Sequence, residues 1–187
     1  MALDPTGEND LGILTAGAAG ALIEPLPPSP SLQIVSTLEE MRGVINQVAA
    51  SAQRMMSIFS PDLEPDVYDQ TPFLDILKRF VLARNFAKVR ILLTDRTRMI
   101  RDGNRLVAMS RRLTSYIEMR PITRPENLHL HSFIIADDKA IAIRLRNGEW
   151  SGVTDMANVA AARQQLADFD VIWQANVPDY GFRAVVN

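Results

Sequence analysis

The stretch of sequence that decides the fold is FLDILKRFVLARNFAKVRILLTD, residues 73–95. Its first half spaces apolar side chains three and four residues apart, which predicts a helix opened by Pro72, with an inner face of Phe73, Ile76, Phe80 and Leu82 or Ala83. Its second half, residues 88–94, is an almost continuous apolar run, typical of a parallel strand covered on both faces. A helix that leads into such a strand indicates an α/β domain.

The same alternation of strands and helices continues on both sides of this unit. Upstream, we predict a strand over 32–35, a helix over 37–52 opened by a capping box of Ser36 and Glu39, and a strand over 55–59. Pro65 predicts an irregular acidic loop over 62–70. Downstream, the pattern predicts a helix over 97–113 kinked near Gly103, a strand over 116–119, a hairpin of 129–136 and 140–145, and a helix over 154–174. The expected fold class is α/β, a single domain whose mostly parallel or mixed sheet is flanked by helices.

Residues 1–31 differ from the rest of the chain. They hold five of its eleven prolines and offer no periodic apolar face, so we expect a flexible, proline-rich tail and linker before a folded domain over 32–187. The apolar run 11–23 is shorter than the roughly 20 residues that a spanning helix needs. The first ten residues carry acids and no base, unlike a secretory signal, so a cytoplasmic location is the default expectation.

The net charge of −2 conceals a strong segregation of charge. Residues 1–77 carry 11 acids and 2 bases, residues 78–124 carry 3 acids and 13 bases, and residues 125–187 carry 8 acids and 5 bases. The segment charges of −9, +10 and −3 add to the total of −2. A basic block between acidic flanks indicates either a binding surface or a block that pairs with acids of its own chain.

The basic block contains a candidate phosphate-binding face. Within the predicted helix over 97–113, one side carries the four arginines Arg98, Arg101, Arg105 and Arg112, beside an apolar stripe of Met99, Leu106, Met109 and Leu113. Guanidinium groups suit phosphate oxygens, so a phosphate-bearing ligand or nucleic acid is a candidate partner. The alternative is internal pairing with the acidic loop, through Asp62, Glu64, Asp66 and Asp69.

Three further pieces of sequence point to a known family. They are MMSIFSPDL (55–63), YIEMR (116–120) and HLHSFIIADDKAIAIRL (129–145), which flank the helix–strand unit of residues 73–95. Together these pieces resemble the phospholipase D-like domains over residues 32–175. The resemblance implies a phospholipase D-like sandwich, a bacterial module, and a site built from an H-x-K-x4-D motif followed by G-S-x-N. It also implies that two half-sites meet, through a tandem repeat or a homodimer, and this chain offers one half.

The motif that the resemblance implies is incomplete. Three registers are possible, and they read His131-Phe133-Asp138, His129-His131-Ala136 and Leu130-Ser132-Asp137. None supplies histidine, lysine and aspartate together, and no G-S-x-N segment follows. The resemblance therefore implies a degenerate form of the family's catalytic apparatus.

These observations leave several functional hypotheses open. The leading one is a catalytically degenerate phospholipase D-like module that binds a phosphate-bearing ligand or a protein partner, without a cofactor. The second is a homodimeric phosphodiesterase or nuclease that uses His129, His131 and Asp138, with Arg144 in place of the lysine. The third is a nucleic-acid-binding domain that uses the arginine face of residues 96–112. Two histidines and one aspartate fall short of the usual metal-ligand set, so no metal site is expected.

Overall fold

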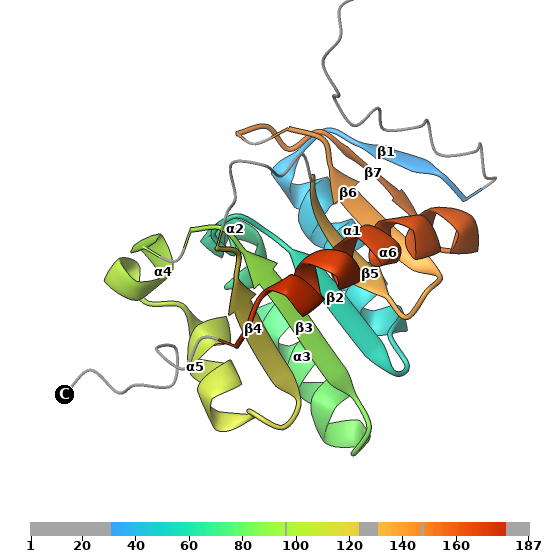
Figure 1. Cartoon of the computed structure of the whole chain (residues 1–187). Helices are drawn as coiled ribbons and strands as arrows, with labels where there is room; N and C mark the ends of the chain where they lie inside the picture. Colours follow the sequence, from blue (N-terminus) through green and yellow to red (C-terminus); the bar gives the residue numbers. More distant parts are fainter. Residues whose placement is uncertain (1–30, 96, 124–130, 147, 179–187) are drawn as a thin grey trace, which may run out of the picture.

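The computed structural model describes residues 31–95, 97–123, 131–146 and 148–178, and gives only the backbone at residues 98–100. Seven strands form one sheet in the order β1-β7-β6-β5-β2-β3-β4 (Figure 1). The strands are β1 (Gln33–Val35), β2 (Met55–Phe59), β3 (Lys88–Leu93), β4 (Ile117–Pro121), β5 (Ser132–Ala136), β6 (Ala140–Arg144) and β7 (Gly152–Asp155). The helices are α1 (Leu38–Ser51), α2 (Pro65–Tyr68), α3 (Thr71–Ala83), α4 (Thr97–Asp102), α5 (Arg105–Arg112) and α6 (Val159–Ala175).

The sheet is mixed, which confirms the expected fold class. Strands β2, β3 and β4 run parallel, and helices cross over between them as parallel pairing requires. Every other neighbouring pair in the sheet is antiparallel, including the β5–β6 hairpin predicted from the sequence. The tail and linker predicted over residues 1–31 lie outside the described residues, except for Ser31.

The sheet separates two apolar clusters. One packs α1, α3 and α5 against one face, with Phe73, Leu77 and Leu106 fully buried in it. The other lies under α6, which crosses the opposite face alone among the described helices (Figure 1). Phe169 and Trp173 lie in this second cluster.

Two arginines of the parallel strands fix α6 in place. Arg90 of β3 pairs with Asp170 at 2.6 Å, and its guanidinium lies 4.8 Å from the centre of the Phe169 ring. Arg120 of β4 lies 4.1 Å from the centre of the Trp173 ring and donates hydrogen bonds to the last turn of α6. These bases of the basic block therefore stabilise the fold rather than line an open surface.

The beginnings of two helices differ from the predictions. Thr37, rather than Ser36, caps α1: its hydroxyl accepts the Glu40 N–H at 3.2 Å, and the Glu40 carboxylate accepts the Thr37 N–H at 3.1 Å. The predicted capping box was therefore one residue too early. Pro65 opens the short helix α2 instead of preventing regular structure, because the first helical position needs no backbone N–H.

Two further predictions were wrong in detail. The predicted helix over 154–174 hides strand β7, so α6 begins only after Asn158, whose side chain accepts the Ala161 N–H at 3.0 Å. The inner face of α3 continues through Leu77 and Val81, whereas Leu82 is 61% exposed. A strand of four residues is too short to show its own period next to a long helix.

Candidate functional site

The candidate site lies where the carboxyl ends of β2 and β3 meet the start of β5 and the end of β6. Ser132, the first residue of β5, pairs in the sheet with Arg144, the last residue of β6. His131 immediately precedes Ser132 and is partly exposed. Open α/β sheets commonly bind ligands at the carboxyl ends of their parallel strands, which makes this edge the first place to examine.

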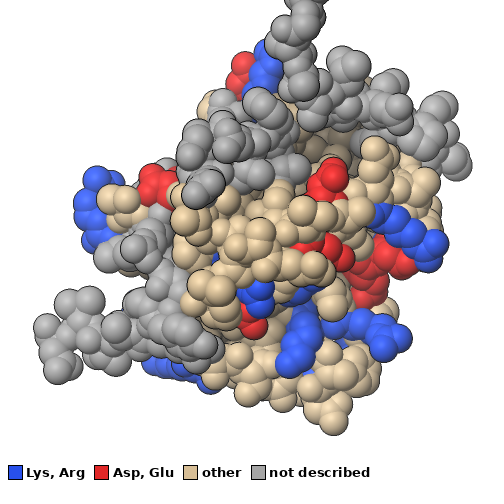
Figure 2. Space-filling model, viewed as in Figure 1, with Lys and Arg blue, Asp and Glu red and all other residues tan. Residues whose placement is uncertain are grey.

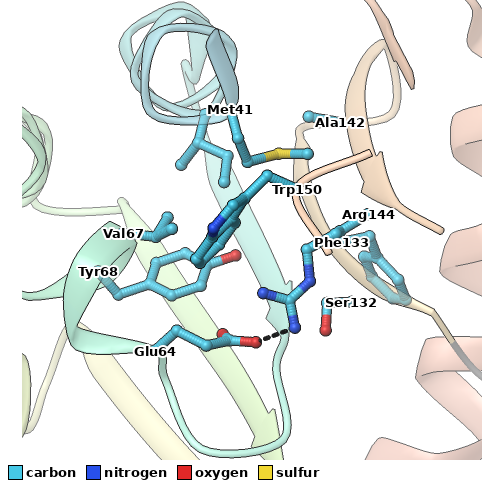
Figure 3. Close-up of a pocket in the computed structure, with 10 residues that line it drawn as sticks. Met41, Glu64, Val67, Tyr68, Ser132, Phe133, Ala142, Arg144 and Trp150 are labelled. Carbon is cyan, nitrogen blue, oxygen red and sulfur yellow. Dashed lines mark ion pairs between the residues drawn. The ribbon is translucent and has the colours of Figure 1, made fainter. Parts of the chain in front are cut away.

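An ion pair between Arg144 and Glu64 occupies this edge (Figure 3). The Arg144 Nη2 atom lies 2.5 Å from the Glu64 Oε1 atom, and the two side chains are only 10% and 13% exposed. The other carboxylate oxygen of Glu64 accepts the Ser60 hydroxyl at 2.5 Å. The Arg144 guanidinium also lies 5.0 Å from the centre of the Trp150 ring. The guanidinium is thus already engaged with a carboxylate and an aromatic ring of its own chain.

The cavity beside this pair is very small. Its volume is about 10 Å³, which is room for about one water molecule. Ser132 lines it, and the buried Ser132 hydroxyl has no hydrogen-bond partner among the described residues, so a water here would satisfy it. Tyr68 also lines it; burial raises the pKa of its phenol, with Glu64 adding to the rise and Arg144 opposing it. Tyr68 therefore stays a neutral hydroxyl at ordinary pH.

The structure separates the residues of the implied catalytic motif. His131 and Asp138 flank β5 at opposite ends, about 20 Å apart at 3.3 Å per residue. Asp138 pairs with Arg163 at 2.7 Å on the surface. His129 lies outside the described residues. In the two registers that do not start from His129, the lysine position holds Phe133 or Ser132. Phe133 is buried under α6, and Ser132 lines the small cavity.

The neighbouring Asp137 has a structural role that the sequence did not reveal. It adopts a positive φ of 56° in the β5–β6 turn. Its carboxylate accepts the backbone N–H groups of Gln53, Arg54 and Met55 at 2.9, 2.8 and 2.9 Å. A single side chain thus joins the hairpin turn to the start of β2, 82 to 84 residues away in sequence.

This contrast between two adjacent aspartates gives a direct test. We expect Asp137→Ala to lower the free energy of unfolding by about 2 kcal/mol, because it leaves backbone donors without their acceptor. Asp138→Ala, the matched control, removes only an exposed ion pair and should cost less than about 0.5 kcal/mol. Urea denaturation of both variants measures the difference. Equal losses would contradict the assigned role of Asp137.

The structure does not form the predicted arginine face as one surface. Gly103, with a φ of 74°, separates α4 from α5, and Asn104 caps α5 by accepting the Leu106 N–H at 2.9 Å. Arg101 pairs with the adjacent Asp102 at 2.7 Å. Because the helix restarts at Arg105, the spacing across Gly103 no longer places the arginines on one face. The side chain of Arg98 lies outside the described part of the chain.

Internal pairing with the acidic loop is confirmed for one of these arginines. Arg105 pairs with Asp69 at 2.8 Å and also donates to the Thr71 hydroxyl at 3.2 Å. On the face that Figure 2 shows, which α6 crosses, patches of Lys and Arg lie beside patches of Asp and Glu. Arg112 differs, since it has no ion pair or hydrogen bond with any described residue.

Two kinds of feature were not found within the described ranges. No three His, Cys, Asp or Glu side chains in these ranges lie close enough to hold a metal ion. None of the helices described there has the length and apolar composition that crossing a membrane requires.

Sequence reasoning missed most of the side chains that build the site. Glu64 was noted only as one acid of the loop, and Tyr68 and Trp150 were not considered. The signal in the sequence was weak, because Glu64 and Arg144 are 80 residues apart and nothing local links them. The sequence did identify His131 and Arg144, the latter as a substitute for the missing lysine.

Comparison with solved structures defines the fold. Nuc from Salmonella typhimurium, a phospholipase D family member, matches with a TM-score of 0.57 and 17% identity, covering 81% of this chain and 99% of Nuc. NucT from Helicobacter pylori matches with a TM-score of 0.57 and 11% identity, covering 79% of this chain and 98% of NucT. Phosphatidylserine synthase from Haemophilus influenzae matches with a TM-score of 0.59 and 12% identity, covering 86% of this chain and 40% of the synthase. The fold is therefore that of the phospholipase D family.

A chromatin protein shares this fold as well. TrmBL2, an archaeal chromatin protein with a novel mode of DNA binding, matches with a TM-score of 0.57 and 11% identity. The match covers 80% of this chain and 55% of TrmBL2, so the chain spans about half the length of that relative. Identities this low establish the fold alone.

The family follows from the sequence itself. The model of a domain of unknown function, DUF7931, matches residues 37–185, so the chain belongs to this family. A comparison with curated proteins finds no match.

Proposed function

We propose that this chain is a catalytically inactive phospholipase D-like domain that works as a binding module, for a phosphate-bearing ligand or a protein partner. The observation that carries the proposal is the buried ion pair of Arg144 and Glu64. Arg144 lies opposite Ser132 in the sheet, and Ser132 holds the lysine position in the register set by Asp137. Its guanidinium is held by Glu64 at 2.5 Å, in a site with room for about one water.

The chemistry of phosphodiester cleavage explains why this arrangement supports inactivity. A positioned cation must offset the charge that builds on the non-bridging phosphate oxygens in the transition state. A guanidinium already neutralised by a carboxylate supplies little of that charge. A phosphoryl group is also much larger than the cavity. Release of Arg144 would require Glu64 to leave and a wider site to open.

The proposal predicts that hydrolysis is absent from the pure protein. We expect no turnover of bis(p-nitrophenyl) phosphate, of single-stranded DNA or of phosphatidylcholine above the level of a His131→Ala variant. Glu64→Gln, which neutralises the competing carboxylate, should not create activity, because the lysine would still be missing. Phosphodiester turnover by the wild-type chain that His131→Ala abolishes would refute the proposal and favour the homodimeric phosphodiesterase.

Nucleic-acid binding is a second candidate, favoured by the shared fold of TrmBL2 and by Arg112, which has no partner among the described residues. Two contacts weigh against it, because Arg101 and Arg105 already have carboxylate partners within the chain. Each such contact lowers the number of phosphates that the surface can neutralise, and therefore the affinity. The surface that carries these arginines therefore suits a partner held by apolar contacts and a few cations better than it suits a nucleic acid.

A further inference from the structure

A groove between α3 and α5 is a concavity that lies outside the Arg144 site. Its volume is about 480 Å³, within the range of about 300–1,000 Å³ typical of ligand pockets. It lies on the face of the sheet opposite α6. Its lining residues are Thr71, Leu74, Asp75, Lys78 and Leu82 from α3, and Arg105, Ala108, Met109, Arg112 and Leu113 from α5.

The groove combines an apolar floor with a basic rim. Leu74 is buried at its base, Met109 and Leu113 are partly buried, and Leu82 is 61% exposed at one end. Lys78 and Arg112 line opposite walls, and neither has an ion pair or hydrogen bond with a described residue. Arg105 also lines the groove but pairs with Asp69, so Lys78 and Arg112 against the single acid Asp75 leave a net charge of +1 (two bases minus one acid). Such a groove fits an acidic segment that also presents apolar side chains.

The chain contains a segment of that chemistry. Residues 4–24 carry four acids, Asp4, Glu8, Asp10 and Glu24, and no base. Between the acids stand the apolar residues Leu11, Ile13, Leu14, Leu22 and Ile23. Residues 55–77 have a similar composition, but they form strands and helices of the folded domain and are therefore not available to fill the groove.

The segment is also long enough to reach the groove. The described chain begins at Ser31, beside β1 at one edge of the sheet, whereas α5 leads into β4 at the other edge. Six strand spacings separate these edges, about 29 Å at about 4.8 Å each. The 17 residues from Leu14 to Ser31 can span about 55 Å when extended.

We propose that residues 4–14, the part of this segment that can reach α5, dock in the groove between α3 and α5, with their acids near Lys78 and Arg112 and their aliphatic side chains on Leu82, Met109 and Leu113. The docked segment competes with any other acidic, apolar partner that approaches the same groove. This proposal is independent of the inactivity proposed above, because the groove shares no lining residue with the Arg144 site.

Paramagnetic relaxation enhancement on the full chain tests this docking. The chain has no cysteine, so Ala83→Cys, an exposed residue beside the groove, gives a single site for a nitroxide label. We expect the amide signals of residues 8–14 to broaden in the labelled, ¹⁵N-enriched protein. Lys78→Glu together with Arg112→Glu should lower the ratio of docked to free segment about tenfold, through two ion pairs turned into repulsions, and abolish most of the broadening.

Two controls separate docking from other causes of broadening. A label at Gln164→Cys, on the exposed side of α6 across the sheet, should leave residues 8–14 sharp. Arg79→Glu, an exposed charge reversal on α3 outside the groove, should leave the broadening intact. Sharp signals with the label at Ala83→Cys would overturn the proposal. Broadening that disappears when labelled protein is diluted with unlabelled protein would also overturn it, because the occupant would then be a second copy.

Discussion

Replacing Arg144 with methionine should lower the free energy of unfolding by about 3 to 5 kcal/mol, one of the two largest effects expected in this molecule. The substitution leaves the Glu64 carboxylate 13% exposed and without its cation. It also removes the guanidinium from the Trp150 ring. Urea denaturation followed by tryptophan fluorescence measures the loss, because Trp150 and Trp173 both lie within the folded domain.

A double variant separates the ion pair from simple packing. In the double variant Arg144→Met with Glu64→Gln, neither side chain of the former ion pair carries a charge, and the glutamine can still accept a hydrogen bond from the Ser60 hydroxyl. We expect the double variant to lose less than about 1 kcal/mol, because a neutral, well-packed pair commonly replaces a buried ion pair at little cost. Arg163→Met, which breaks the exposed pair with Asp138, is the matched surface control and should cost less than about 0.5 kcal/mol. Losses that simply add in the double variant would show that the two side chains are not coupled.

Gly152→Ala should produce the second large loss of folding stability. A Cβ atom at Gly152 would lie 2.3 Å from the backbone oxygen of Ile143 and 2.6 Å from the Met41 Cε atom. Met41 can move, but the Ile143 oxygen belongs to the neighbouring strand β6 and cannot. The backbone of β7 must therefore shift, and we expect a loss of about 3 kcal/mol, at the upper end for overpacked cores.

Gly43→Ala is the matched control for Gly152→Ala. Gly43 lies inside α1, and a Cβ atom there would meet nothing within 4 Å. Alanine should therefore stabilise the protein by about 0.5–1 kcal/mol, because it favours the helix more than glycine does. Thermal unfolding of both variants should shift the melting temperature in opposite directions. A Gly152→Ala protein as stable as wild type would mean that β7 does not approach β6 as closely as described.

Elements that carry their own sequence pattern were predicted well, whereas features that depend on distant contacts were not. The strand β2 was predicted with its observed bounds, and the β5–β6 hairpin and α3 within a few residues, because each carries its own apolar period or turn. The break at Gly103 was expected as a kink, yet it ends one helix and begins another. That difference matters for function, since it divides the arginines between α4 and α5.

The sequence by itself determined the α/β fold class, because that class follows from residue types at short spacings, and no register in it supplies the histidine, lysine and aspartate of an H-x-K-x4-D motif together. Only the tertiary structure decided which side chains surround Ser132 at the start of β5. Glu64 and Arg144 meet there although they are 80 residues apart in sequence, and Asp137 joins a hairpin to β2 across more than 80 residues. Such contacts depend on how the sheet assembles, and no local pattern of residues encodes them.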